Sequence, residues 1–225
     1  MAILPDGAVR VPADLAPLLE HSVLRPEATA LEVRRACAEA REHRLGAVCV
    51  RPAWVREVRR ELAGSGVKVV AVVDFPEGQA GTAERAREAR TVVAGGAEEV
   101  DVVLPLALLR AKDYRGLLRD LGEVVAAGAP VKVILETCRL SREEKAIAAA
   151  LSKGAGAAWV KTSTGFAEGG ATEEDVALLR SVVGTEFGVK ASGGVRTAGD
   201  ALRMVRAGAD RVGTSASVAI LAGCF

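Results

Sequence analysis

Short apolar runs alternate with longer amphipathic stretches along most of the chain. The apolar runs are rich in Val, Ala and Ile, and several stop at Gly or Pro, which is typical of buried strands. Two of the longer stretches open with a capping box, at 29–32 and 141–144, which predicts a helix start. The predicted strands cover 20–24, 46–50, 67–75, 98–104, 131–136, two runs that begin at Ala158 and Gly188, and 210–213. The predicted helices cover 29–43, 53–62, 79–93, 113–127, 141–153, 172–183, 198–207 and a closing segment after Ser215.

This alternation predicts an α/β fold with a parallel sheet covered by helices, because the strands are apolar almost throughout. Strand starts recur about every 22 to 33 residues, with no linker or low-complexity break. Eight strand–helix units in this length fit a lean (β/α)₈ (TIM) barrel. We expect one domain over 1–225, with 1–19 as a short N-terminal lead-in. An open doubly wound sheet is the alternative, which we rank lower because no strong GxGxxG follows the first strand.

Composition narrows the class of protein. Half of the 225 residues are hydrophobic but only 3% are aromatic, so Ala, Val and Leu must build the core. The formal net charge is +1, which gives no basic excess for nucleic acid. No apolar run approaches the roughly 20 residues that span a bilayer. The chain has no Asn and one Gln, which suggests a heat-adapted source, although a GC-rich genome produces part of this bias.

The four cysteines, Cys37, Cys49, Cys138 and Cys224, show no CxxC spacing. They fit free thiols in a reducing cytoplasm better than disulfides or a zinc site. Cys49 stands within an apolar strand and could line the barrel, where an aldehyde could reach it, although a buried and inert thiol is the default.

Four lysines lie within the predicted strands. Lys68 and Lys132 come at strand starts, so we expect them to be solvated at the bottom rim. Lys161 and Lys190 come late in the sixth and seventh strands, at the carboxyl-terminal face where the active sites of such barrels lie. Because these two strands are neighbours, we expect the two side chains to approach each other.

Such a pair has a direct chemical use. A lysine attacks a carbonyl only as the neutral amine, and its free pKa of about 10.4 leaves little of that form at neutral pH. A second ammonium nearby, together with desolvation, lowers the pKa, so Lys190 could activate Lys161. Two unrelated strand-end lysines remain the alternative.

Asp101 interrupts the apolar strand 98–104, where Glu98 and Glu99 stand at the start and are expected to be solvated. By alternation Asp101 lies on the face opposite Val100 and Val102, so it points into the barrel. An inward carboxylate must be paired or protonated. Beside Lys190 it could relay protons, and a structural ion pair is the competing interpretation.

Two glycine-containing segments follow the seventh and eighth strands. They contain Gly193 and Gly194, and Gly213 and Ser215. These loops form the usual phosphate site of (β/α)₈ barrels, because glycine lets backbone N–H groups approach an anion. Together they favour a phosphorylated small molecule as the ligand.

Several segments resemble the deoxyribose-phosphate aldolases, class I enzymes on a (β/α)₈ barrel. The strongest are VKTSTGF, GVKASGGVRT and RVGTSAS, and EHSVLRPEAT, GAVCVRP, VVDFPEG, GAEEVDVVLP and VKVILETC are also similar. The likeness extends from about residue 20 to the end. It implies a lyase that reversibly cleaves 2-deoxy-D-ribose 5-phosphate to acetaldehyde and D-glyceraldehyde 3-phosphate, in deoxyribose phosphate catabolism.

The resemblance also implies residue roles. Lys161 matches the Schiff-base nucleophile, Lys190 the lysine that tunes it, and Asp101 the proton-relay acid. The segments expected to bind substrate and phosphate contribute Ser22, Gly165, Gly193, Gly194, Gly213 and Ser215. No cofactor or metal is implied, in keeping with the lack of a His/Cys/Asp ligand pattern. A homodimer or homotetramer is a guess from the same likeness.

Three positions depart from the family pattern: Asp74 and Ser217 stand where Gly is common, and Pro105 where Asn is common. Asp74 adds a carboxylate near the top of the third strand, so substrate preference stays open. Two hypotheses compete with the aldolase: a Schiff-base aldolase of shifted substrate choice, and a catalytically silent barrel that binds a phosphorylated ligand.

Overall fold

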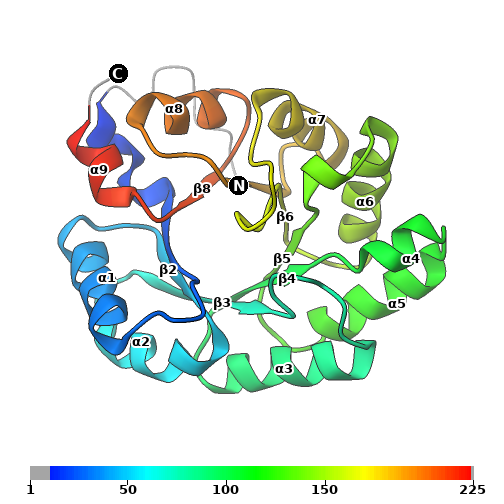
Figure 1. The fold of residues 1–225 in the computed structure, drawn as a ribbon, viewed down its shortest axis with the longest axis horizontal. Coiled ribbons are helices and arrows are strands. Elements are labelled where there is room, and N and C mark those ends of the chain that lie inside the picture. Colours follow the sequence, from blue (N-terminus) through cyan, green and yellow to red (C-terminus); the bar gives the residue numbers. More distant parts are fainter. Residues whose placement is uncertain (1–10, 224–225) are drawn as a thin grey trace.

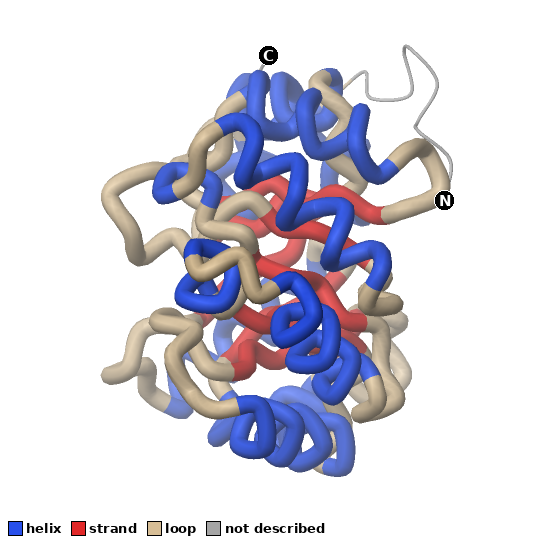
Figure 2. Tube along the Cα trace, turned by 90° about the vertical axis from the view of Figure 1, so that its right-hand side faces the viewer, coloured by secondary structure: helices blue, strands red, loops and turns tan. Residues whose placement is uncertain are grey.

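The computed structural model describes residues 11–223, and within them eight parallel strands close into a barrel in the order β1 to β8 (Figure 1). This confirms the predicted (β/α)₈ fold, and the open sheet is excluded. Figure 2 shows the strands enclosed by helices. The strands are β1 (Leu19–Val23), β2 (Ala47–Val50), β3 (Lys68–Val73), β4 (Glu99–Val103), β5 (Val131–Ile134), β6 (Trp159–Lys161), β7 (Gly188–Ser192) and β8 (Arg211–Thr214).

The helices follow the strands in turn. The α-helices are α1 (Ala30–Glu42), α2 (Val55–Glu61), α3 (Thr82–Ala94), α4 (Leu106–Arg110), α5 (Tyr114–Val125), α6 (Arg142–Gly154), α7 (Glu173–Val183), α8 (Ala198–Arg206) and α9 (Ser217–Ala222). Short 3₁₀ helices are η1 (Pro12–Leu18), η2 (Pro52–Trp54) and η3 (Thr137–Arg139).

Two predictions about elements need correction. Helix α4 was not expected, because its five residues are too few to show a helical period. The lead-in was expected to be irregular or partly helical and to reach residue 19; η1 occupies Pro12–Leu18 within it, and β1 begins one residue earlier than expected, at Leu19. The rest of the predicted lead-in, 1–10, lies outside the described residues. No helix between residues 11 and 223 is long and apolar enough to cross a membrane.

Alternation along the strands divides the side chains between two regions. One set, including Val48, Val69 and Val133, belongs to the large apolar core that also contains helix residues. A separate, small apolar cluster contains Ala47, Cys49, Val70 and Val72 from β2 and β3, with Leu24. Other interior positions, mostly on the strands opposite this cluster, carry the charged side chains described below, so the barrel interior has an apolar region and an ionic one.

Trp159 is a core residue, and only 7% of it is exposed. It lies against Gly188, its register partner on β7, and the Arg211 guanidinium stacks over it at 5.0 Å from the ring centroid. A Cβ at Gly188 would overlap the indole ring. Gly188 is therefore required by the close approach of β6 and β7.

We expect Gly188→Ala to lower the free energy of unfolding by about 1–3 kcal/mol, because the indole must move within a packed core. Gly122→Ala is the matched control, since a Cβ there meets nothing within 4 Å. Gly122 lies inside α5, where alanine stabilises a helix by about 1 kcal/mol relative to glycine. Chemical denaturation of both variants checks the signs, and equal effects would refute the steric argument.

Candidate active site

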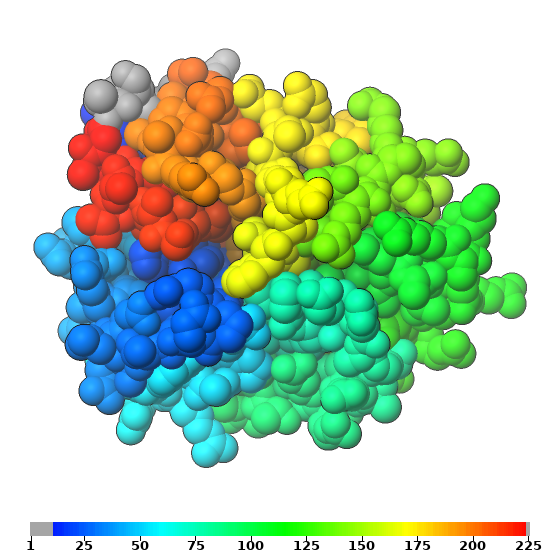
Figure 3. Space-filling model, in the orientation of Figure 1, coloured from blue at the N-terminus to red at the C-terminus, as the bar shows by residue number. Residues whose placement is uncertain are grey.

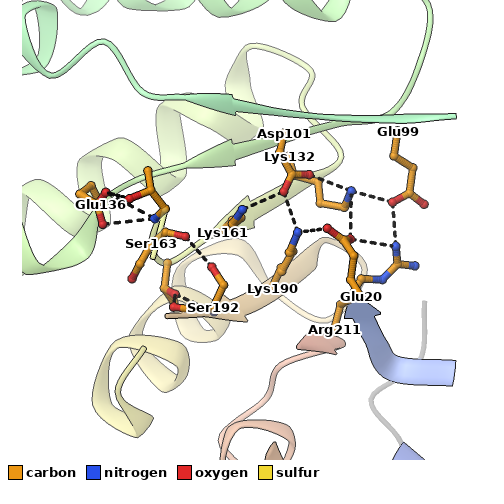
Figure 4. A network of polar contacts seen from close by, with 12 residues as sticks. Glu20, Glu99, Asp101, Lys132, Glu136, Lys161, Ser163, Lys190, Ser192 and Arg211 are labelled. Carbon is orange, nitrogen blue, oxygen red and sulfur yellow. Dashed lines mark hydrogen bonds and ion pairs between the residues drawn. The ribbon is translucent and has the colours of Figure 1, made fainter. Parts of the chain in front are cut away.

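Lys161 and Lys190 lie side by side inside the barrel. Lys161 ends β6, Lys190 lies in the middle of β7, and the two are register partners. Both are almost fully buried. Their ammonium groups contact one carboxylate oxygen, Asp101 Oδ2, at 2.9 Å from Lys161 and 2.6 Å from Lys190 (Figure 4). The structure therefore brings the three predicted site residues together, and Asp101 points into the barrel as alternation predicted.

Lys132 is the third lysine of this group, and the prediction that it is solvated was wrong. It is fully buried, and its Nζ donates to Asp101 Oδ1 at 3.0 Å. The reason is the stagger of strands in a closed barrel. Lys132 is the second residue of β5, yet it pairs with Asp101, the third residue of β4. Lys68, at the start of β3, is solvated as expected, with 48% of its side chain exposed.

Three further buried ionic residues, Glu20, Glu99 and Arg211, continue this network from Lys132, and we call these four residues the floor cluster. Lys132 contacts Glu99 at 2.6 Å and Glu20 at 3.6 Å, while Arg211 contacts Glu99 at 2.7 Å and Glu20 at 3.5 Å. Glu20 also pairs with Lys190. Glu99 was expected to be solvated, and that was wrong, because its carboxylate lies between Lys132, Arg211 and Lys68.

The charges of this network are held in place by one another. Burial opposes ionisation of Asp101, but the ammonium groups of Lys132, Lys161 and Lys190 outweigh it and hold its pKa well below the usual range. Burial likewise opposes the charged form of Lys190, but Asp101 and Glu20 raise its pKa. The pKa of Glu99 falls to about 2, because Lys132 and Arg211 outweigh its burial.

A cavity of about 600 Å³ opens above Lys161 at the carboxyl-terminal ends of the strands. Lys161 lines this cavity, whereas Asp101 and Lys190 do not and lie beneath it. All the predicted binding residues line it: Ser22, Gly165, Gly193, Gly194, Gly213 and Ser215. In Figure 3 the segment coloured yellow, which includes the loop after β6, reaches across the middle of the visible face.

Glycine is required at several positions of the cavity, for different structural reasons. Gly193 and Gly194 have φ of 86° and 80°, a backbone region that residues with a Cβ disfavour. Gly170 packs closely against Gly193, and a Cβ on Gly170 would collide with the Gly193 backbone. Gly213 has another reason, because a Cβ there would lie 2.8 Å from Lys190 Cε. The absence of a side chain at Gly213 thus leaves the space that the Lys190 side chain occupies.

Glu136 was not singled out from the sequence. It follows β5 in the left-handed region at φ 55°, and its buried carboxylate accepts a hydrogen bond from Thr164 Oγ1 at 2.5 Å. The same carboxylate accepts from Thr164 N–H at 3.3 Å. Glu136 therefore anchors the loop after Lys161. The sequence does not reveal a positive φ at a non-glycine residue. The one signal for Glu136 was its position, as a carboxylate that directly follows an apolar run.

Two aromatic rings lie beside the Lys161 amine. The Phe75 ring centroid is 6.0 Å from Lys161 Nζ, and Phe166 packs edge-on against Phe75 with 5.2 Å between centroids. Phe166 is 46% exposed and lines the cavity. The rings, with the small apolar cluster, place Lys161 at a boundary between an apolar wall and an ionic one.

The family departures lie outside the cavity lining. Asp74 accepts from Ala80 N–H at 3.2 Å and pairs with the buried Arg85 at 2.5 Å, and Arg85 in turn lies 3.0 Å from Asp120. Its carboxylate thus holds the loop after β3. Pro105 precedes α4, and Ser217 is buried as the first residue of α9.

Cys49 is fully buried, and burial raises the pKa of its thiol, so it is a protonated and inert group. Its Sγ lies within 4.8 Å of carboxylate oxygens of Glu20 and Asp101, a grouping that the sequence did not reveal. These carboxylates already bind lysine ammonium groups, so a metal cation would meet repulsion there.

His21, beside Ser22 on β1, is buried and lines the cavity. Its Nε2 lies 4.0 Å from Glu39, and its Nδ1 has no hydrogen-bond partner among residues 11–223. Burial lowers its pKa against the opposing effect of Glu39, which favours the neutral ring.

A barrel cavity lined by one lysine, with a second lysine and a shared carboxylate behind it, is an arrangement suited to a Schiff-base-forming aldolase. A model of the DeoC/LacD family of aldolases matches residues 15–223, and the chain belongs to that family. The chain is therefore a carbon–carbon lyase.

Named relatives agree with this assignment. The chain is 50% identical over 212 residues to the deoxyribose-phosphate aldolase of Thermotoga maritima. The aligned region covers 93% of this chain and 86% of that protein. It is 48% identical to that of Brevibacillus brevis, over 91% of this chain and 94% of the relative. A tetrameric deoxyribose phosphate aldolase from Aeropyrum pernix superposes with a TM-score of 0.89 at 36% identity, covering 98% and 96% of the chains.

We expect Gly213→Ala to fold but to lose aldolase activity by about 10-fold or more, because the new methyl displaces Lys190 from Asp101. Gly194→Ala is the comparison, since a Cβ there meets nothing within 4 Å and the strain is confined to its own backbone. Steady-state cleavage rates, with circular dichroism for folding, check this. Full activity in Gly213→Ala would show that Lys190 does not need its present position.

The lowered pKa of Glu99 has a consequence for stability. A carboxyl group whose pKa is lower in the folded state contributes stability above its unfolded pKa and loses it as pH falls. The shift from 4.5 to about 2 corresponds to roughly 3 kcal/mol that should be lost between about pH 4.5 and 2. Denaturant titrations at pH 6, 4 and 3 should show this decrease, and a flat profile would contradict it.

Proposed function

We propose that this aldolase reversibly cleaves 2-deoxy-D-ribose 5-phosphate to acetaldehyde and D-glyceraldehyde 3-phosphate, with Lys161 as the Schiff-base nucleophile. One observation carries the assignment. Lys161 is the amine that both lines the cavity and shares Asp101 Oδ2 with Lys190. An electrophile can therefore reach Lys161, whereas Lys190 and Lys132 lie below it.

The buried charges around Asp101 are unequal in number. The buried ion-pair network there holds four cations and three carboxylates: Lys132, Lys161, Lys190 and Arg211, and Glu20, Glu99 and Asp101. An unmatched buried charge is costly, so this network disfavours a further positive charge. Asp101 and Glu20 both contact Lys190, and Lys132 has three carboxylates around it. Lys161 contacts one carboxylate and is the lysine that lines the cavity.

The reaction follows from this arrangement. Lys161 Nζ adds to C1 of the open-chain aldehyde, and loss of water from the carbinolamine gives an iminium. The iminium accepts the electron pair of the C2–C3 bond as the C3 hydroxyl loses its proton, which releases glyceraldehyde 3-phosphate and leaves an enamine. Asp101 and Lys190, through a water, take up that proton and return one to the enamine carbon. Hydrolysis of the new iminium frees acetaldehyde and Lys161. The steps need no cofactor or metal.

The phosphate is assigned to the rim formed by Gly193, Gly194, Gly213 and Ser215. The two glycines of positive φ precede α8, whose N-terminus adds positive potential for an anion. Ser22 and Gly165 face the same cavity and would contact the sugar.

An aldolase of shifted substrate choice is the second candidate, since the substrate itself is known only from relatives. Asp74, which raised this question, binds Arg85 and lies outside the cavity lining, so nothing in its contacts favours another substrate. A silent ligand-binding barrel is disfavoured, because burial of three lysines and their carboxylates serves no purpose in phosphate binding.

The cellular setting is also a proposal. We infer a single domain over 1–225 and a cytoplasmic location, which the free thiols Cys37, Cys49 and Cys138 favour; Cys224 lies outside the described residues. A homodimer or homotetramer is proposed, supported by the tetrameric relative from Aeropyrum pernix. No nucleic acid or membrane partner is proposed.

Borohydride reduction in the presence of acetaldehyde should attach a two-carbon group to Lys161, which peptide mass mapping would locate. Lys161→Arg should abolish both trapping and cleavage, because the guanidinium keeps the charge but has no nucleophilic amine at neutral pH. Lys112→Arg, at an exposed turn, is the control and should retain both. A trapped adduct on another residue, or cleavage by Lys161→Arg, would sink the assignment.

A further inference from the structure

The floor cluster contains the most heavily paired lysine of the barrel, and the reaction above does not use it. Lys132 contacts three carboxylates, Asp101 at 3.0 Å, Glu99 at 2.6 Å and Glu20 at 3.6 Å. It is fully buried and does not line the cavity, so it cannot touch the substrate. Figure 4 shows Lys132 between Asp101 and Glu99, with Arg211 below.

The two oxygens of Asp101 are divided between partners. Oδ1 accepts from Lys132, and Oδ2 accepts from both Lys161 and Lys190. A carboxylate held at one oxygen cannot rotate without breaking that ion pair. Lys132 thus determines which oxygen faces the two upper lysines.

We propose that Lys132 is a positioning residue for the reaction: it fixes Asp101 so that Oδ2 faces Lys161 and Lys190, and its charge sets the pH dependence of imine formation at Lys161. This inference rests on the proposed role of Lys161.

The charge argument has a definite sign. With Lys132 present, the buried ion-pair network around Asp101 holds one cation more than it has carboxylates, which disfavours a further positive charge. Without Lys132 the cations and carboxylates of this network are equal in number, so imine formation at Lys161 should require a higher pH. Burial makes Lys132 an effective permanent charge, because its three carboxylates raise its pKa despite desolvation.

The groups that face Lys161 come from several strands. Asp101 on β4 and Lys190 on β7 contact it directly, while the Cys49 thiol on β2 is protonated. Glu20 on β1 and Lys132 on β5 act one step away, through Lys190 and Asp101. The effect of Lys132 should therefore be transmitted mainly through Asp101.

The test measures borohydride trapping of acetaldehyde at Lys161 across a pH series. We expect Lys132→Met to move the pH of half-maximal trapping upward by ~1 unit or more, because one buried positive charge near Asp101 is lost. Lys132→Arg keeps the charge and should stay within a few tenths of a unit of the unchanged enzyme. Glu20→Gln removes one negative charge from the same cluster and should move the midpoint downward.

Lys68→Met is the matched control, because Lys68 contacts Glu99 from the solvated end of the cluster and is half exposed. It should leave the midpoint and the cleavage rate unchanged. A purely structural Lys132 would lower thermal stability or the trapping rate at every pH and leave the midpoint in place, and that result would overturn the proposal. If Lys132→Met does not fold, Lys132→Gln, which also lacks the charge but keeps hydrogen-bond donors for Asp101, takes its place in the same pH series.

A double-mutant cycle isolates the route of the effect. In an Asp101→Asn background, Lys132→Met should change trapping far less than in the unchanged enzyme, because its partner has lost its charge. Equal effects in both backgrounds would contradict positioning through Asp101. Failure of the unchanged enzyme to trap acetaldehyde at Lys161 would instead refute the proposed function, so the two failures are distinguishable.

Discussion

The ion pairs of Asp101 are the interaction on which the rest of the site depends. One fully buried carboxylate is shared by Lys132 at one oxygen and by Lys161 and Lys190 at the other. A carboxylate in such a place would be protonated if it stood alone, since burial penalises its charge. Three ammonium groups keep it ionised, and it in turn allows three lysines to be buried. Removal of Asp101 would leave three buried lysines without the carboxylate that they share, which is why the group acts as a unit.

The barrel supplies the geometry that this unit requires. Parallel strands in register place Lys161 beside Lys190 and Asp101 beside Lys132. Alternation along each strand turns these side chains inward, while their neighbours pack beneath the helices. Gly213 then provides the space through which the Lys190 side chain passes. The apolar wall from β2 and β3 excludes water on the other side, so the charges interact more strongly than they would in solvent.

The alternation of strands and helices could be predicted because hydrophobic residues follow a different spacing in each kind of element. All eight strands lie close to their expected positions. Asp101 and Lys161 could be identified because each interrupts or ends an apolar run. Lys132 and Glu99 were misjudged for a reason that the sequence does not contain. Both stand near strand starts, but both side chains are buried inside the barrel, and Lys132 is the register partner of Asp101, the third residue of β4. Glu136 escaped notice because its left-handed backbone has no local signature.

The unequal count of buried charges connects this architecture with reactivity. A fold under selection for stability alone would balance its buried ions or replace them with apolar side chains, since buried ion pairs add little net stability. Here four cations meet three carboxylates, and the extra one is the group that opens to the cavity. An excess of buried positive charge disfavours ammonium groups in general, and a nucleophilic lysine has to be a neutral amine. The charges of the floor cluster therefore act on Lys161 at the mouth of the barrel, although Lys132, Glu99 and Glu20 do not line the cavity.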